Sequence, residues 1–268
     1  MTQLPDIPLS ATALRQLERW QADVDALASY TQRVEAAKRL FPQRNTARNR
    51  IFAEVRRTLT SMCAGARRCG YCEDSAADEV EHIWPKDLYP ERVFAWSNYL
   101  YACGMCNGPK NSRFAVFPPG ARGPVEVGRL PGAPITRPRK GTPVLIDPRH
   151  EDPMAFWMLD LQGTFFFVPT AAQGSKDHVR AEYTLRILRL NRELLATSRA
   201  EAFGAYRARL SEYVSLRQKG ASRAQMDLRI QAIQRAAHPT VWKEMQRQHR
   251  EHPELRTLFH KAPEALRW

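Results

Sequence analysis

The sequence lacks any long hydrophobic run. Its longest uninterrupted apolar stretch is six residues, Met154–Leu159, whereas a helix that spans a membrane needs about 20. The first residues also lack a basic segment followed by an apolar one, which is the pattern of a secretory signal. These absences exclude a membrane protein and argue against an exported one. We therefore expect a cytoplasmic protein with no membrane partner.

A P-loop is also absent, because no G-x-x-x-x-G-K-[ST] stretch occurs in the 268 residues. Any dependence on ATP is therefore expected to come from a partner protein. Positive charge, in contrast, is in excess: 41 Lys and Arg oppose 28 Asp and Glu, a formal net charge of +13. Such an excess points toward a polyanion, most commonly nucleic acid. Because only eight of the 41 are Lys, arginine enrichment from a GC-rich genome is the alternative explanation.

Four of the five cysteines form two C-x-x-C pairs, Cys69 with Cys72 and Cys103 with Cys106. Zn²⁺ prefers four tetrahedral ligands, and two short cysteine knuckles supply four thiolates. Disulfides are the first alternative, but no secretory context supports them. A redox motif is the second, but it explains only one pair. We predict a structural zinc site, and we expect Cys63 to be a small buried apolar side chain.

Apolar periodicity predicts helices on both sides of the cysteine-containing segment. Apolar residues recur every three or four positions over 9–40, which predicts one helix, and again from Ile51 to Met62, which predicts a second. From Asp177 onward the pattern is helical again. Its expected apolar stripe includes Leu190 and Leu194. We expect a break at Gly220-Ala221-Ser222 and shorter helices punctuated by three prolines, Pro239, Pro253 and Pro263.

The middle of the chain predicts a loop and short strands. Residues 117–143 hold seven Pro and five Gly, which disfavour regular structure and predict a long surface loop. Val144-Leu145-Ile146 predicts a short strand. Phe156–Leu161 and Thr164–Val168, joined by Gln162-Gly163, predict a hairpin.

The residues between and just after the C-x-x-C pairs carry the candidate chemistry. Histidine, here His82 after Glu81, supplies a base near neutral pH. A carboxylate and a carboxamide oxygen, as in Glu81 and Asn107, suit Mg²⁺. Residues 71–92 hold seven acids against two bases, whereas the flanks at 41–66 and 108–143 are basic. This arrangement is expected of an enzyme that binds nucleic acid around an acidic metal site.

Four motifs stand in order: C-x-x-C, E-H-x-x-P-K, W-x-N-x-L-x-x-C and C-N-x-x-K. Together they resemble the HNH nuclease family, whose core is the ββα-metal finger. The resemblance is specific over 69–113 and weaker over most of the chain. There, Asp147-Pro148 and the Arg180…Leu190-Asn191-Arg192 stretch look like the HNH subunits of bacterial anti-phage defence systems. In those systems, Septu and related retron operons, an HNH protein pairs with an ATPase.

The fold class implied is α+β and mostly helical, with a small ββα core that contains a zinc-stapled double C-x-x-C. Four segments are expected: an N-terminal helical region (1–66), the HNH core (67–116), a Pro/Gly-rich basic loop with short strands (117–175), and a C-terminal helical region (176–268).

The resemblance also implies residue roles. His82 would be the general base, and Glu81 the metal-binding carboxylate. Asn98 would fix the loop that carries His82, Asn107 would complete the metal site, and Lys110 would meet the scissile or adjacent phosphate. The four paired cysteines match the family's structural zinc site. Many members have Asp at the Glu81 position, and Asn rather than His at the Asn107 position favours Mg²⁺ over Zn²⁺.

The predicted function is a Mg²⁺- or Mn²⁺-dependent HNH endonuclease that hydrolyses nucleic-acid phosphodiester bonds, with DNA favoured over RNA. It would be the nuclease effector of an anti-phage defence complex with an ATPase partner. A stand-alone restriction-type nuclease and a non-catalytic zinc-stapled nucleic-acid-binding or scaffold subunit are the alternatives. The joint occurrence of His82, Asn98, Asn107 and Lys110 weighs against the last. A neighbouring ATPase gene would separate the first two.

Overall fold

Capping residues divide the N-terminal region into three helices, α1 (Ala11–Asp25), α2 (Tyr30–Arg44) and α3 (Arg50–Ser61). The single helix expected over 9–40 is wrong, because the chain breaks between α1 and α2. Ser29 accepts a hydrogen bond from the backbone of Gln32, whose side chain accepts one from Ser29 N. This reciprocal capping box starts a new helix despite the continuous apolar period.

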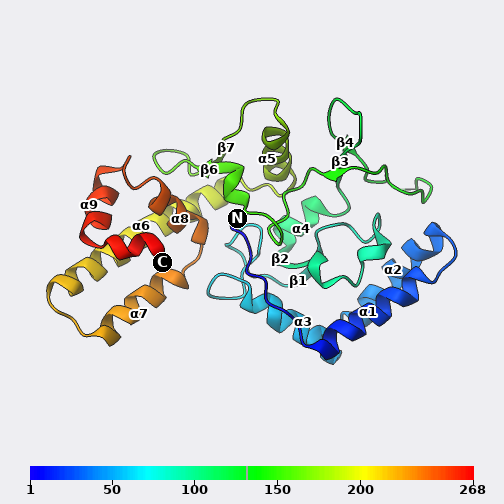
Figure 1. Cartoon of the computed structure of the whole chain (residues 1–268), viewed down its shortest axis with the longest axis horizontal. Helices are drawn as coiled ribbons and strands as arrows, with labels where there is room; N and C mark the ends of the chain where they lie inside the picture. Colours follow the sequence, from blue (N-terminus) through cyan, green and yellow to red (C-terminus); the bar gives the residue numbers. More distant parts are fainter. Residues whose placement is uncertain (131) are drawn as a thin grey trace.

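The cysteine-containing segment folds into two antiparallel strands followed by a short helix, namely β1 (Glu79–His82), β2 (Tyr99–Ala102) and α4 (Gly104–Lys110). Two 3-10 turns lie between the strands, η1 (Pro90–Arg92) and η2 (Trp96–Asn98). Both faces of β2 are buried. Its two tyrosines pack with the N-terminal helices, whereas Leu100 and Ala102 pack with the C-terminal half. The strand pair therefore lies between two apolar cores (Figure 1).

A three-stranded sheet follows the core, with β3 (Ala115–Phe117) between β4 (Val125–Glu126) and β5 (Thr142–Pro143). Most of the segment around β4 is exposed and irregular, as expected for 117–143. The structure, a computed structural model, describes residues 1–130 and 132–268, so Pro131 of the predicted loop lies outside the described residues.

The strand expected at Val144–Ile146 is wrong, because the paired residues are Thr142 and Pro143. Val144–Ile146 is buried, and two of its N–H groups bond to the Ala115 carbonyl and the Thr184 hydroxyl. The apolar run correctly predicts that these residues are buried, but it does not predict which residues pair in the sheet. The predicted hairpin is confirmed as β6 (Trp157–Leu159) and β7 (Phe167–Pro169), after a 3-10 turn, η3 (Pro153–Ala155).

The C-terminal region contains five helices and a final 3-10 turn: α5 (Lys176–Ile187), α6 (Glu193–Gln218), α7 (Arg223–Gln234), α8 (Pro239–Arg247), α9 (Pro253–Lys261) and η4 (Pro263–Arg267). The break expected at Gly220–Ser222 is confirmed, and each of the three predicted prolines begins an element. Leu194 is 63% exposed, so its place in the apolar stripe was wrong. Because α5 ends at Ile187 and α6 begins at Glu193, Leu194 belongs to a second helix and does not continue the apolar face of the first.

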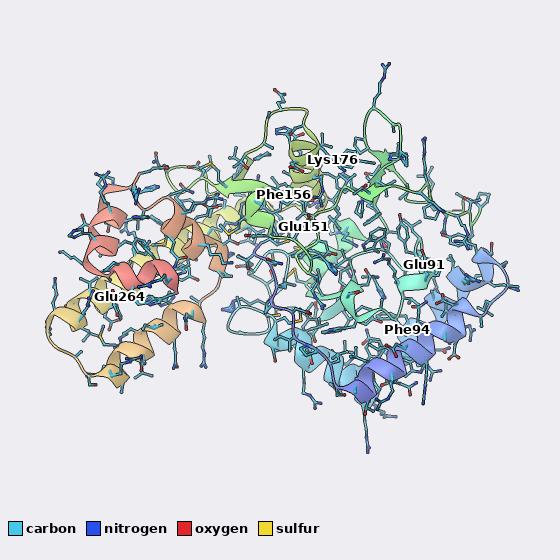
Figure 2. All side chains as sticks on the ribbon, in the orientation of Figure 1. Glu91, Phe94, Glu151, Phe156, Lys176 and Glu264 are labelled. Carbon is cyan, nitrogen blue, oxygen red and sulfur yellow. The ribbon has the colours of Figure 1, made fainter. Side chains whose placement is uncertain are left out.

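The two helical regions lie at opposite ends of the molecule, with α1 and α2 at one end and α7 and α9 at the other (Figure 1). Side chains join the core to both. Phe94, labelled in Figure 2, packs against Trp20 of α1 with ring centroids 5.6 Å apart. None of the helices among the described residues has the length and apolar character needed to cross a membrane. The four segment boundaries drawn from the sequence stay a prediction.

Candidate functional site

Four cysteines converge at the edge of the ββα unit. Cys69 and Cys72 lie in a turn before β1, while Cys103 caps α4 and Cys106 lies in its first turn. All four are buried, and their sulfur atoms lie within 4.8 Å of one another. Cys72 Sγ and Cys103 Sγ are 3.9 Å apart. A tetrahedral site with Zn–S bonds of about 2.3 Å has sulfur–sulfur edges of ~3.8 Å, so the cluster fits a zinc ion.

Backbone hydrogen bonds fix the first cysteine turn without a disulfide. Tyr71 N lies 3.4 Å from Cys69 Sγ, and Glu73 N donates to the Cys69 carbonyl. Gly70 N donates to the Tyr101 carbonyl of β2, which ties the turn to the sheet. A hydrogen bond from Cys103 is the largest cause that lowers the pKa of Cys72 and favours its thiolate. Cys63, expected to be buried, is only half-buried.

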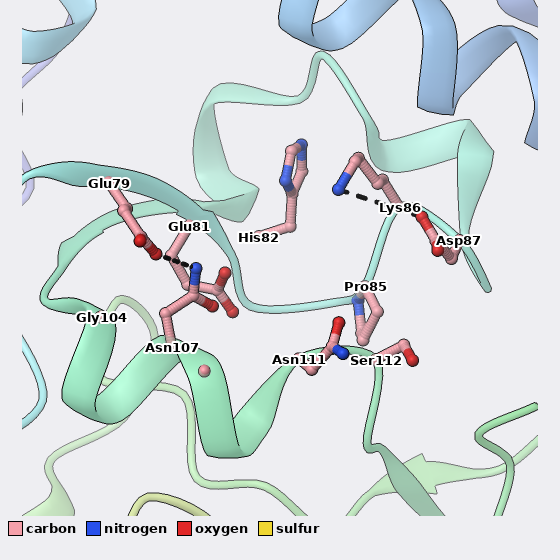
Figure 3. A pocket seen from close by; sticks show the side chains of 11 residues that line it. Glu79, Glu81, His82, Pro85, Lys86, Asp87, Gly104, Asn107, Asn111 and Ser112 are labelled. Carbon is pink, nitrogen blue, oxygen red and sulfur yellow. Dashed lines mark hydrogen bonds and ion pairs between the residues drawn. The ribbon is translucent and has the colours of Figure 1, made fainter.

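A cavity of about 290 Å³ lies beside the end of β1, between the loop that follows it and α4 (Figure 3). Three of the predicted site residues line it: Glu81, His82 and Asn107. Glu79 and Lys86 line it as well, although no role was predicted for either residue. Asn98 and Lys110 are not among its lining residues.

His82 is held by one hydrogen bond and two aromatic rings. Its Nε2 lies 2.9 Å from the Val93 carbonyl oxygen. Because a carbonyl only accepts, Nε2 carries the proton and Nδ1 keeps its lone pair. The rings of Phe41 and Tyr99 pack against the imidazole at centroid distances of 4.3 and 5.2 Å. Burial, with the charge of Lys86 as a smaller cause, lowers the pKa of His82 to about 3. The histidine is therefore a neutral base at neutral pH.

Asn98 ties together the two ends of the loop that carries His82 and Val93. Its Oδ1 accepts from Trp84 N at 2.8 Å, and its Nδ2 donates to the carbonyls of Trp84 and Arg92 at 3.0 Å. The side chain is 1% exposed. Its contacts are all with backbone, so it acts on the shape of the loop.

Glu81 faces α4 rather than the N-terminal helices. Its Oε1 accepts a hydrogen bond from the ammonium of Lys110, which also donates to the His82 carbonyl at 2.9 Å. Burial raises the pKa of Glu81, and the charge of Lys110 opposes that shift. The predicted contact of Lys110 with a phosphate stays a prediction, while the structure places its ammonium against the Glu81 carboxylate and the His82 carbonyl.

Asn107 reaches the cavity from α4. Its Nδ2 donates a hydrogen bond to the Glu79 carboxylate (Figure 3). Because the amide nitrogen is engaged, Oδ1 is the atom that can face a cation. Glu79 and Glu81 share one face of β1, since alternate residues of a strand point the same way. That alternation was visible in the sequence and could have indicated Glu79.

Comparison with known proteins finds a partial likeness. A 69-residue segment is 46% identical to the Septu protein PtuB of Bacillus thuringiensis. The match covers 24% of this chain and 27% of PtuB, so it spans about a quarter of that relative's length. No family model matches the chain, and no solved structure matches it.

Proposed function

We propose that this chain is a divalent-metal-dependent HNH endonuclease that hydrolyses phosphodiester bonds of nucleic acid, with DNA favoured over RNA. The observation that carries the proposal is the convergence of Glu81, Asn107 and a neutral His82 on one cavity. The likeness to PtuB supports a place in Septu-type anti-phage defence. The chain would then be the nuclease effector of a complex with an ATPase partner.

The donor atoms at the two sites suit different metals. A carboxylate oxygen of Glu81 and the amide oxygen of Asn107 are hard ligands, which fit Mg²⁺ or Mn²⁺. Such an ion, when bound, neutralises charge that develops on the phosphate and on the leaving oxygen. The four cysteines fill every position of a tetrahedral zinc, so zinc there would be structural.

His82 would take the proton from the attacking water through Nδ1. The Val93 carbonyl accepts from His82 Nε2 and, at 2.6 Å, from the Tyr99 hydroxyl. These contacts hold the ring in one tautomer, and burial keeps it unprotonated. A general base placed in this way typically contributes about 10²–10⁴-fold to the rate. As in the HNH family, we expect products with a 5′-phosphate and a 3′-hydroxyl.

The decisive experiment is a nuclease assay of the wild type and His82→Ala on DNA and RNA. Each protein is assayed with Mg²⁺, with Mn²⁺ and with chelator, alone and with any ATPase encoded beside its gene. We expect metal-dependent cleavage by the wild type and a loss of at least about 10²-fold in His82→Ala. The matched control is His260→Ala, an exposed histidine of α9. Cleavage by His82→Ala at the wild-type rate would contradict the proposed mechanism.

The partner arm of the assay separates the alternatives. Cleavage by the isolated chain at its full rate would indicate a stand-alone nuclease. Nucleic-acid binding without cleavage under every condition would indicate a zinc-stapled binding or scaffold subunit. Cleavage that requires the ATPase supports the defence-complex assignment.

A further inference from the structure

Two lysines belong to the motifs around the cavity, and their surroundings differ. The Lys110 side chain is 0% exposed, and its ammonium contacts the Glu81 carboxylate and the His82 carbonyl. It contributes nothing to the lining of the cavity. Lys110 therefore contacts the predicted metal ligand without lining the space that a phosphate would enter.

Lys86 lies in the cavity wall. Its side chain is 33% exposed, and its ammonium is 3.9 Å from the Asp87 carboxylate, at the outer limit of an ion pair. Figure 3 shows its amine turned back beside His82. The ammonium also lies 5.8 Å from the centre of the Phe41 ring, which packs against the same histidine. Lys86 thus presents a partly solvated cation next to the proposed base.

We propose that these two lysines have separate tasks: Lys86 contacts the substrate phosphate, and Lys110 is a positioning residue that orients the Glu81 carboxylate. The inference rests on the proposed function, because it concerns the same cavity.

The free-energy cost of moving each ammonium supports this division. If Lys110 moved to a phosphate, the Glu81 carboxylate and the His82 carbonyl would be left buried without that partner, which is expensive. If Lys86 moved, it would lose a long, partly exposed ion pair with Asp87 and a contact at 5.8 Å with the Phe41 ring, and such exposed contacts contribute little. A substrate phosphate would therefore recruit Lys86 and leave Lys110 in place.

The first test is the salt dependence of nucleic-acid binding, measured in the His82→Ala background so that the substrate stays intact. Each phosphate contact contributes about 0.9 to the slope of log affinity against log salt for duplex DNA. Lys86→Met should lower the slope by about one. Lys110→Met should leave it unchanged, as should the control Lys219→Met at the exposed end of α6.

The second test is Mn²⁺ binding by the zinc-loaded protein without nucleic acid, followed by electron paramagnetic resonance. Residues that orient a metal ligand typically account for about 10–100-fold in metal affinity. Lys110→Met should weaken Mn²⁺ binding by about that factor, whereas Lys86→Met should not weaken it. Lys110→Gln, which keeps an N–H donor for Glu81, should weaken it less and serves if the Met variant does not fold.

The assignment is overturned if the Lys110 variants lower the salt slope and keep wild-type Mn²⁺ affinity, or if Lys86→Met leaves the slope unchanged. Neither measurement needs cleavage, so the two proposals fail separately. If the wild type never cleaves but the lysine variants differ in salt slope and in Mn²⁺ affinity as predicted, the lysine assignment stands and the nuclease proposal fails. If the wild type cleaves and the lysine variants show neither difference, the nuclease proposal stands and the lysine assignment fails.

Discussion

At the scale of single residues, the burial of His82 has a consequence for stability. Burial lowers the pKa of folded His82 to about 3, whereas an unfolded histidine has a pKa near 6.5. Below pH 6.5 the unfolded chain therefore binds more protons at this residue than the folded chain does. The stability that depends on neutral His82 is complete above that pH and falls as the pH approaches 3.

We predict that the wild type loses about 1.4 kcal/mol of unfolding free energy per pH unit, relative to His82→Gln, as the pH falls below ~6.5. Urea unfolding of both proteins from pH 7.5 to pH 5 measures the difference, and other titrating groups cancel in it. Parallel curves for the two proteins would show that His82 is not held neutral by the fold.

Cys69 gives a second prediction at this scale. Cys69→Ser removes one of four buried sulfur ligands, so we expect the protein to lose its zinc and to unfold at a lower temperature. Cys63→Ser is the matched control, because Cys63 lies outside the cluster. Elemental analysis and thermal unfolding supply the measurements. Full zinc content in Cys69→Ser would exclude the four-cysteine site.

At the scale of elements, the loop between β1 and β2 depends on Asn98. Asn98→Ala leaves the backbone groups of Trp84 and the Arg92 carbonyl without their partner. An unpaired buried group costs about 1–3 kcal/mol, so we expect a loss of roughly 2–4 kcal/mol in unfolding free energy. The exposed neighbour Ser97 supplies the control variant, Ser97→Ala. Equal stabilities of the two variants in urea would contradict this role.

Local patterns were the part of the fold that the sequence could predict. The prolines that begin α8 and α9 occupy the first helical turn, and the C-x-x-C spacing limits the geometry of each cysteine pair. The break before Tyr30 was also local, but its capping box competed with an unbroken apolar period. Periodicity alone therefore predicted one helix where the structure has two, α1 and α2.

Contacts between distant segments could not be predicted from the motifs. The motif placed Lys110 near the site but did not show that its ammonium pairs with Glu81. In the same way, no spacing indicated that Phe41 of α2 packs on His82, or that Val93 accepts from it. These contacts exist because β2 is buried between two cores, and that arrangement depends on the whole chain.

At the scale of the whole molecule, part of a basic loop lies beside an acidic cavity. The carboxylates of Glu79, Glu81 and Asp87 line the cavity together with the ammonium-bearing side chain of Lys86. The basic loop between β3 and β5 is fastened beside it. Arg129 donates to the Tyr30 hydroxyl at 2.8 Å and to the Asp87 carbonyl, and Arg137 lies 5.0 Å from the Tyr30 ring. These contacts hold part of the loop against α2 and the Asp87 segment of the cavity wall.

This placement predicts which cationic side chains contact the phosphates of nucleic acid. Replacing Arg122, Arg139 and Lys140, all exposed in the loop, by Gln should weaken binding and lower the salt slope by about 2–3, because each released contact contributes about 0.9. The same change at Lys219, Lys243 and Arg250, all exposed in the C-terminal region, removes equal charge and should leave the slope nearly unchanged. Both triple variants are titrated with duplex DNA in the His82→Ala background. A larger effect from the C-terminal set would place the nucleic acid on α6–α9, and an equal effect from both would show that net charge, rather than its arrangement around the cavity, governs binding.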